Sequence, residues 1–391
     1  MRRVAIVILL LLLVAGGFRL WLHGELNRPY KGYSQHDVIV DIPHGTSGST
    51  IAFMLQENGV VRSQLAFTLL SRWRWRQKLQ AGEYRFDQPM TPREVFNTIA
   101  AGHIYIHTIK IPEGWTMFDI ADALEGEGLC RRSEFLAAAR DPALILDLAP
   151  RARTLEGFLF PATYEFTRHT TPQEIAATMV RRFRTVWAGL PGIDHDVAGN
   201  ITGLPARLDV EQVVAMASLV ERETPLESER PLVAGVFYNR LQKGMPLQCD
   251  PTVMYALALA GQPVHTLGPG DVAFDSPYNT YRHPGLPPGP IANPGEASLR
   301  AALDPPRVPY LFFVANTEGG HFFSETLREH NRNVALYRER LAAESDPDEK
   351  PVPQKPAPQK LASQKAVPKK LASQKPVPQK LVSQKKPRSH R

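Results

Sequence analysis

The stretch DVEQVVAMASLVERET, residues 209–224, predicts a helix that is apolar on almost every side. Asp209 followed three residues later by Gln212 is a capping-box pattern, and Pro225 ends the helix. A helix that is apolar nearly all round is typical of a protein core. We therefore expect this helix to be buried within the largest domain of the chain.

Two glutamates lie near the end of this helix. At about 100° per residue, Glu221 shares a stripe with Val214 and Ala217, whereas Glu223 lies on the opposite side. The two carboxylates therefore cannot act together on one bond, as paired catalytic carboxylates about 5–5.5 Å apart do. A carboxylate on such a helix is either a structural ion pair or functional. In a desolvated cleft its pKa would rise, as a general acid requires.

The pattern around this helix predicts an α+β domain over residues 105–343. Further helices are expected at 172–187, 229–243, 251–260 and from Thr326 to about Leu341. Strands are expected at 155–161 and 163–166, and a buried strand at 310–315 is expected to pair with 321–323.

A smaller module is predicted over residues 36–104. Its pattern is a strand at 37–43, a helix from a Ser49 cap to Leu55, a helix at 65–72 and a strand at 81–86, in βααβ order. A weak repeat with an offset of 69 residues places Ile42-Pro43 on Ile111-Pro112. The repeat indicates that the main domain opens with a similar strand–helix–helix unit, and chance similarity is the alternative.

The N-terminus predicts a membrane anchor over residues 1–22. Arg2 and Arg3 precede an uncharged run from Val4 to Phe18, and the apolar stretch continues to Leu22. This length approaches the ~20 residues that span a bilayer, and the leading arginines favour a cytoplasmic N-terminus. A cleaved signal peptide is the alternative. Either topology places the bulk of the chain outside the cytoplasm.

The C-terminal residues 344–391 predict a disordered, basic tail. Residues 351–391 hold nine lysines, two arginines and no acid, so the remaining chain carries about −4 of the net charge of +7. A Lys/Pro/Gln-rich repeat of this kind lacks the apolar surface needed to fold. The two cysteines, Cys130 and Cys249, cannot build a structural zinc site alone, and the sequence predicts neither a metal nor a cofactor.

Several motifs in fixed order resemble one family. They are ASLVERET (217–224), VFYNRL (236–241), LQCDPTV (247–253), SPYNTY (276–281), GLPPGPIANPG (285–295) and EHN (329–331), preceded by EGWT (113–116) and EGFLFP (156–161). Together they resemble the MltG, or YceG-like, family of endolytic murein transglycosylases over about residues 30–343. The basic tail lies outside that pattern.

The resemblance implies an activity and a catalytic residue. In that family the catalytic acid is the glutamate of the motif that falls on Glu221, and the membrane-proximal module resembles a LysM glycan-binding unit. The implied reaction cleaves the MurNAc–GlcNAc β-1,4 bond of nascent peptidoglycan and leaves a 1,6-anhydroMurNAc end, which limits strand length. The enzyme would lie in the inner membrane with a periplasmic catalytic domain. Its partners would be glycan strands and peptidoglycan synthases.

The other matched positions suggest substrate contacts and support. Gln248, Asp250, Tyr278, Asn279, Thr280 and Tyr281 are expected to bind substrate, although Asp250 also fits a helix cap and the loop residues could simply pack. Ser218, Glu223, Asn239 and Arg240 are expected to support the site, with the last two holding Glu221 in place. Cys249 stands where the family more often has a small hydroxyl residue. This difference puts individual substrate contacts in doubt, but not the reaction.

The sequence is also compatible with two other functions. A hydrolytic muramidase would need a second carboxylate near Glu221, such as Asp250 or Glu223. A non-catalytic wall-binding scaffold would need neither. Nucleic-acid binding by the basic tail is disfavoured, because the predicted topology places the tail outside the cytoplasm.

Overall fold

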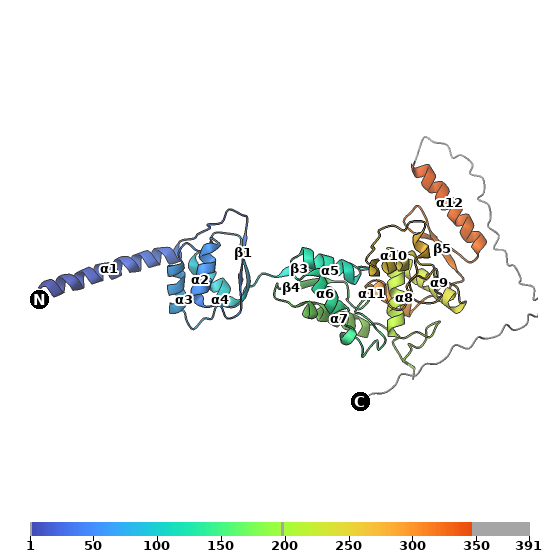
Figure 1. Cartoon of the computed structure of the whole chain (residues 1–391), viewed down its shortest axis with the longest axis horizontal. Coiled ribbons are helices and arrows are strands. Elements are labelled where there is room, and N and C mark those ends of the chain that lie inside the picture. The colour runs from blue at the N-terminus through green and yellow to red at the C-terminus, as the bar shows by residue number, and fades with distance from the viewer. Residues whose placement is uncertain (1, 197–198, 346–391) are drawn as a thin grey trace, which may run out of the picture. The chain divides into compact units, whose positions relative to one another are not determined.

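The computed structural model describes residues 2–196 and 199–345, so the predicted C-terminal tail lies almost wholly outside the described residues. The chain begins with one long helix, α1 (Arg2–Asn27), which is apolar enough to cross a membrane by length and composition. Figure 1 shows the elements in chain order.

The N-terminal module is built on a two-stranded antiparallel sheet. β1 (Val38–Ile42) pairs with β2 (Gly82–Phe86), and α2 (Gly48–Glu57) and α3 (Gln64–Trp73) lie between them in the chain. The predicted βααβ order is confirmed, with α4 (Pro92–Ala101) as an additional helix. The predicted cap of α2 is wrong by two residues, because Ser47 rather than Ser49 accepts from the Thr50 amide at 3.2 Å.

The main domain opens with the strand–helix–helix unit that the repeat predicted. β3 (His107–Lys110) is followed by α5 (Met117–Gly126) and α6 (Arg132–Ala139), then by a short 3₁₀ helix, η1 (Pro142–Leu144). β3 pairs in antiparallel register with β4 (Thr163–Phe166), and α7 (Pro172–Ala188) follows. The N-terminal module and the start of the main domain thus have the same strand–helix–helix order, which supports the sequence repeat.

The predicted strand at 155–161 is wrong. This apolar segment is a buried turn in which Gly157 has φ +87° and the side chains of Phe158 and Leu159 are fully buried. The Oδ1 of Asn293 accepts from the Gly157 and Leu159 amides, each at 2.9 Å. A side chain 134 positions away thus takes the backbone hydrogen bonds that a neighbouring strand would have taken.

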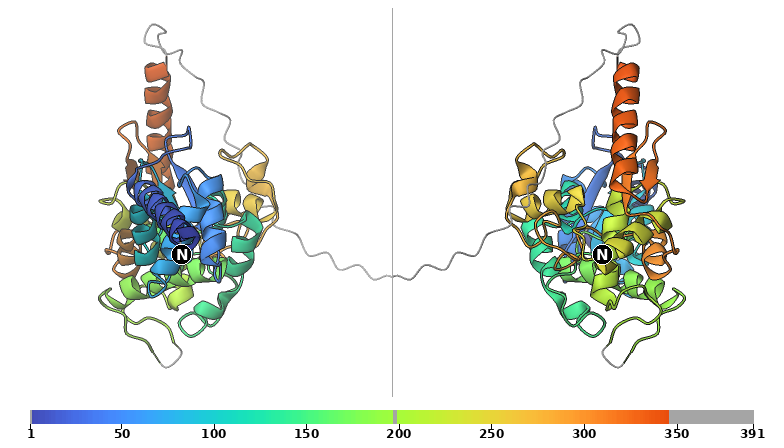
Figure 2. Two further views of the ribbon diagram at one scale, coloured as in Figure 1. Left: turned by 90° about the vertical axis from the view of Figure 1, so that its left-hand side faces the viewer. Right: turned by 90° about the vertical axis from the view of Figure 1, so that its right-hand side faces the viewer.

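The predicted central helix is confirmed as α8 (Val210–Glu223). Its capping box is formed by Asp209 and Gln212, and its residues from Val213 to Val220 are all buried. Around it lie α9 (Arg230–Gln242), α10 (Asp250–Leu259) and α11 (Glu296–Leu303). Figure 2 shows these segments, coloured yellow-green to orange, packed into one body.

The remaining elements follow the prediction with one correction. A short 3₁₀ helix, η2 (Asp271–Ala273), precedes α11. β5 (Phe312–Ala315) and β6 (His321–Ser324) form the expected hairpin, but β5 is only half-buried rather than buried. The last helix, α12 (Leu327–Ser345), is capped by Thr326, whose hydroxyl accepts from the Glu329 amide at 3.2 Å.

Candidate active site

Glu221 lies in the last turn of α8, where only 5% of its side chain is exposed. Its Oε1 accepts a hydrogen bond from the Arg230 guanidinium at 2.9 Å. Its Oε2 accepts from the backbone amide of Gly295 at 3.0 Å. Both carboxylate oxygens therefore have a donor, as a buried carboxylate needs.

Arg230, the first residue of α9, also contacts a second carboxylate. Its guanidinium, with 8% of the side chain exposed, lies 3.2 Å from Glu113 Oε2. Glu113 is 48% exposed and belongs to the turn before α5. That turn is fixed by two hydrogen bonds of Gly114: its amide donates to the Asn293 carbonyl at 2.9 Å, and its carbonyl accepts from Arg222 at 3.1 Å.

Burial raises the pKa of Glu221 above its ordinary value. The Gly295 amide and the Arg230 charge act in the opposite direction, and the nearby Glu113 carboxylate raises the pKa further. The net upward shift favours the protonated form of Glu221, as a general acid requires.

Asn293 connects the loops around this site. Its Nδ2 donates to the Trp115 carbonyl at 2.9 Å and to Glu156 Oε1 at 2.8 Å. Its backbone amide donates to the same Trp115 carbonyl at 2.8 Å. Because Gly295 follows two residues later, these bonds position the amide that holds Glu221.

Glu156 completes this support from a fully buried position. Both of its oxygens accept from the Met117 amide, each at 3.0 Å, at the start of α5. Burial raises the pKa of Glu156 to about 8, an effect that exceeds the opposing hydrogen bonds from Met117, Tyr255 and Asn293. The raised pKa favours a neutral, hydrogen-bonding Glu156 at pH 7.

Four of these residues had no predicted role. They are Glu113, Glu156, Arg230 and Asn293. Three of them fall within the quoted motifs EGWT, EGFLFP and GLPPGPIANPG, which was the available signal. Arg230 lies outside every quoted motif, and only the packing of α9 against α8 reveals it.

Three predicted substrate-binding residues have accessible side chains. Gln248 and Asp250 are exposed, and the partly exposed Tyr281 donates its hydroxyl to Asp250. Gln248 has φ +54° and is the one non-glycine residue with positive φ among residues 2–196 and 199–345. Such a backbone conformation is uncommon outside glycine and is often found at functional sites.

The other three residues of that prediction are mainly used within the protein. Asn279 is fully buried, and its Nδ2 donates to the carbonyls of Val272 and Phe274 at 3.0 and 2.7 Å. Thr280 accepts from the Cys249 amide at 3.0 Å. Tyr278 is half-buried with its ring 5.1 Å from that of Tyr255. These contacts favour a role in shaping the loop over direct sugar contact.

Asn239 and Arg240 do not hold Glu221, which corrects the predicted support. The amide of Asn239 donates to the carbonyls of Val308 and Tyr310 at 2.7 and 2.8 Å. Arg240 donates to the Leu311 and Leu247 carbonyls, each at 2.7 Å. Both side chains therefore fix the segments that lead into β5 and α10.

Ser218 lies on α8 three residues before Glu221. Its buried hydroxyl donates to the Ala215 carbonyl at 2.7 Å and accepts from the Ile291 amide at 3.0 Å. It therefore ties α8 to the loop that ends at Gly295, whose amide holds Glu221.

Glu223 belongs to a separate cluster with Cys249. Burial raises the pKa of Glu223 to about 7, while a hydrogen bond from the Cys249 thiol lowers it. Asp250 adds a like charge, whereas His321 and Arg240 add favourable ones. Both cysteines, Cys130 and Cys249, are free thiols.

Comparison with known proteins shows the family of the chain. The YceG-like family matches residues 40–336. An endolytic murein transglycosylase of Bacillus subtilis (strain 168) is 34% identical over 343 residues, which cover 83% of this chain and 91% of the relative. One of Streptococcus pneumoniae (strain D39) is 30% identical over 366 residues, covering 85% of this chain and 64% of the relative.

A solved structure extends the similarity to three dimensions. The crystal structure of a YceG-like protein from Listeria monocytogenes is 33% identical and has a TM-score of 0.50. It aligns with 76% of this chain and 99% of its own. The order of motifs, the match over most of the chain and the shared fold lead to one conclusion: this chain belongs to the YceG-like family.

Proposed function

We propose that this chain is an endolytic murein transglycosylase in which Glu221 acts as both general acid and general base. The observation that carries the assignment is the Glu221 carboxylate, almost fully buried and held by Arg230 and the Gly295 amide. Two relatives that share at least 30% identity over most of this chain carry the name of this activity.

The first step requires a proton on Glu221. Desolvation raises the pKa of this carboxyl and so favours the protonated form. Glu221 would give that proton to the glycosidic oxygen as the bond between C1 of MurNAc and this oxygen breaks. The leaving GlcNAc is then released as an alcohol, and Glu221 becomes a carboxylate.

The second step uses the carboxylate that the first step leaves. Glu221 would take the proton from the C6 hydroxyl of the same MurNAc while this oxygen bonds to C1. The product is a 1,6-anhydro ring, and Glu221 is again protonated. Because the nucleophile belongs to the substrate, no water is consumed and one carboxyl group serves both steps.

We further propose that α1 anchors the enzyme in the inner membrane, with the rest of the chain on the periplasmic side. α1 is a single helix of 26 residues with mean hydropathy 2.5 over its most apolar window. Arg2 and Arg3 favour retention of its N-terminus in the cytoplasm. This location would place the active site beside newly made glycan and the synthases that produce it.

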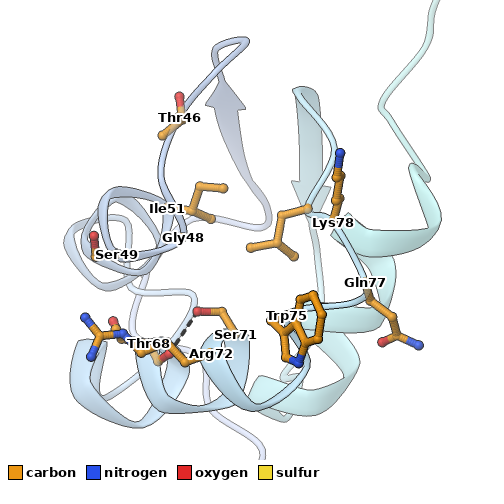
Figure 3. A pocket seen from close by; sticks show the side chains of 11 residues that line it. Thr46, Gly48, Ser49, Ile51, Thr68, Ser71, Arg72, Trp75, Gln77 and Lys78 are labelled. Carbon is orange, nitrogen blue, oxygen red and sulfur yellow. Dashed lines mark hydrogen bonds between the residues drawn. The ribbon is translucent and has the colours of Figure 1, made fainter.

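The N-terminal module is proposed to be a LysM-like glycan-binding unit. A cavity of about 470 Å³ opens between the start of α2 and the segment after α3. Figure 3 shows Thr46, Ser71, Trp75, Gln77 and Lys78 around it. An exposed indole beside hydroxyl and amide groups suits the apolar face and the hydroxyl groups of a sugar ring.

Digestion of purified peptidoglycan by the full-length protein tests the activity. Internal fragments ending in 1,6-anhydroMurNAc, identified by mass, are expected from the wild-type protein and should be lost in Glu221→Gln. Glu211→Gln is a matched control, since it removes another buried carboxylate from the same helix. Its products should be unchanged.

The other outcomes would contradict the proposal in different ways. Reducing MurNAc ends would indicate a hydrolytic muramidase. Binding without cleavage by any variant, measured in membranes with intact glycan strands, would indicate a scaffold.

A further inference from the structure

The hydrogen bonds of Glu221 favour its charged form, although an acid catalyst must carry a proton. Oε1 faces the Arg230 guanidinium and Oε2 faces the Gly295 amide. Neither donor can accept a proton from Glu221. A lone pair remains on each oxygen, but the charge of the guanidinium opposes protonation of Glu221, and this opposition weakens when the guanidinium moves away from Oε1.

Glu113 offers the guanidinium another carboxylate. The same nitrogen of Arg230 lies 2.9 Å from Glu221 and 3.2 Å from Glu113. The Nε of Arg230 is buried without a partner among residues 2–196 and 199–345. The guanidinium is therefore shared between two carboxylates and retains an unused donor, so a rotation toward Glu113 exchanges one ion pair for the other.

Gly295 allows this close arrangement. A Cβ atom on Gly295 would lie 2.0 Å from Glu113 Oε1, so the Glu113 carboxylate lies directly against the Gly295 backbone. The amide of that same residue holds Glu221 Oε2. Glu113 and Glu221 thus meet at Gly295 as well as at Arg230.

We propose that Glu113 is a positioning residue: it competes with Glu221 for the Arg230 guanidinium and so sets how often Glu221 carries the proton needed by the leaving sugar oxygen. The proposal rests on the proposed role of Glu221 as acid and base. When Arg230 turns to Glu113, Glu221 holds a proton more readily. After the proton is transferred, the return of Arg230 stabilises the Glu221 carboxylate until it takes the proton of the C6 hydroxyl.

The other groups near Glu221 do not replace Glu113 in this role. Arg222, the next residue of α8, donates to the Gly114 carbonyl. On α11, Ser298 contributes a neutral hydroxyl, while Glu296 and Arg300 pair with each other at 2.6 Å. In the part of the chain that the structure describes, Arg230 forms ion pairs with Glu113 and Glu221 alone.

The pH dependence of anhydro-product formation by the full-length protein tests the proposal. In Glu113→Gln the guanidinium stays with Glu221, so the pKa of Glu221 falls and the protonated fraction is lost at lower pH. We expect the alkaline limb of the rate profile to move down by about one pH unit. Above this limb the rate should then be about tenfold lower than in the wild type, with little change below it.

Three further variants sharpen the test. Arg230→Gln removes the cation and should move the alkaline limb in the opposite direction, to higher pH. Gly295→Ala keeps both carboxylates but displaces Glu113, because its Cβ would occupy the place of Glu113 Oε1. It should shift the limb downward like Glu113→Gln, while the conservative Glu113→Asp should restore part of the wild-type profile.

The outcomes separate this proposal from the proposed function. An unshifted limb in Glu113→Gln, or an equal loss of rate at every pH, would overturn the positioning role. Shifts of Glu113→Gln and Arg230→Gln in the same direction would overturn it too. Full activity of Glu221→Gln would instead reject Glu221 as the acid and base, whatever Glu113 does.

Discussion

Glu156 shows how a carboxyl group can support this site without taking part in the reaction. It is 1% exposed, and its hydrogen bonds join the start of α5 to Asn293. A neutral carboxyl group can donate one hydrogen bond and accept others, whereas a charged one at this depth would be costly. The pKa of about 8 therefore matches its position as a structural link.

The stability of the protein should fall with rising pH because of Glu156. Its pKa is about 8 in the folded protein and near 4.5 when the side chain is exposed. Between pH 4.5 and pH 8 the folded state therefore binds more protons than the unfolded state. Its contribution is complete below about pH 4.5 and is lost as pH rises toward 8, at about 1.4 kcal/mol per pH unit.

Glu156→Gln removes this titration while keeping a neutral amide of similar shape. Denaturant unfolding of both proteins between pH 5 and 8 should give a shallower decline for the variant. The decline should not vanish, because the pKa of Glu223 is also raised, to about 7. Equal slopes for the two proteins would show that Glu156 is charged in the folded state.

At the scale of elements, the turn at 155–161 depends on one glycine. Gly157 has φ +87°, and a Cβ there would lie 2.4 Å from Pro290 Cγ and 2.8 Å from Val214 Cγ1. The turn can therefore approach α8 and the 285–291 loop only without a side chain. Its amide also donates to Asn293, so the same glycine links the turn to the active-site loop.

Gly157→Ala should destabilise the main domain by about 3 kcal/mol, because backbone strain and overpacking act together. Gly244→Ala is the matched control: its φ is +63°, and no atom lies within 4 Å of the added Cβ. Strain alone should cost this control about 1 kcal/mol. Thermal unfolding measures both, and equal losses would show that the contact with Pro290 and Val214 is not tight.

At the scale of the whole molecule, two hydrophobic cores divide the described chain. One holds the module residues from Val40 to Ile99 together with Leu26 of α1, and the other holds residues from Ile109 to Ala302. Separate cores allow separate tasks, so binding and cleavage should respond to different substitutions.

Trp75→Ala should weaken retention of the full-length protein on insoluble peptidoglycan by several-fold, since the contact between a sugar ring and the indole is lost from the module's cavity. The cleavage products should remain anhydro-ended. Trp73→Ala removes an equally exposed tryptophan, 71% against 72%, that does not line the cavity. Equal retention of all three proteins would reject the glycan-binding module.

The anchor is tested in the same preparations. The full-length protein should stay with the membrane after alkaline extraction. This treatment removes peripheral proteins but does not extract a membrane-spanning helix. Release into the soluble fraction would reject α1 as a retained anchor and favour a cleaved leader.

Local features could be predicted from the sequence because neighbouring residues produce them. The Asp209–Gln212 cap, the apolar surface of α8 and the hairpin from Phe312 to Ser324 all follow from patterns within a few residues. The position of Glu221 on an apolar stripe also follows from helical periodicity, and its side chain is indeed buried.

The tertiary structure alone decided which groups surround Glu221. Glu113 and Arg230 are separated by 117 positions, and Gly295 lies 74 positions beyond Glu221. The side chain of Asn293 accepts from two amides of segment 155–161, which takes the place of the strand pairing predicted for this segment. Local sequence determines helices, turns and caps through short-range sterics and hydrogen bonds. Partners distant in sequence are determined by packing, which no short-range pattern encodes.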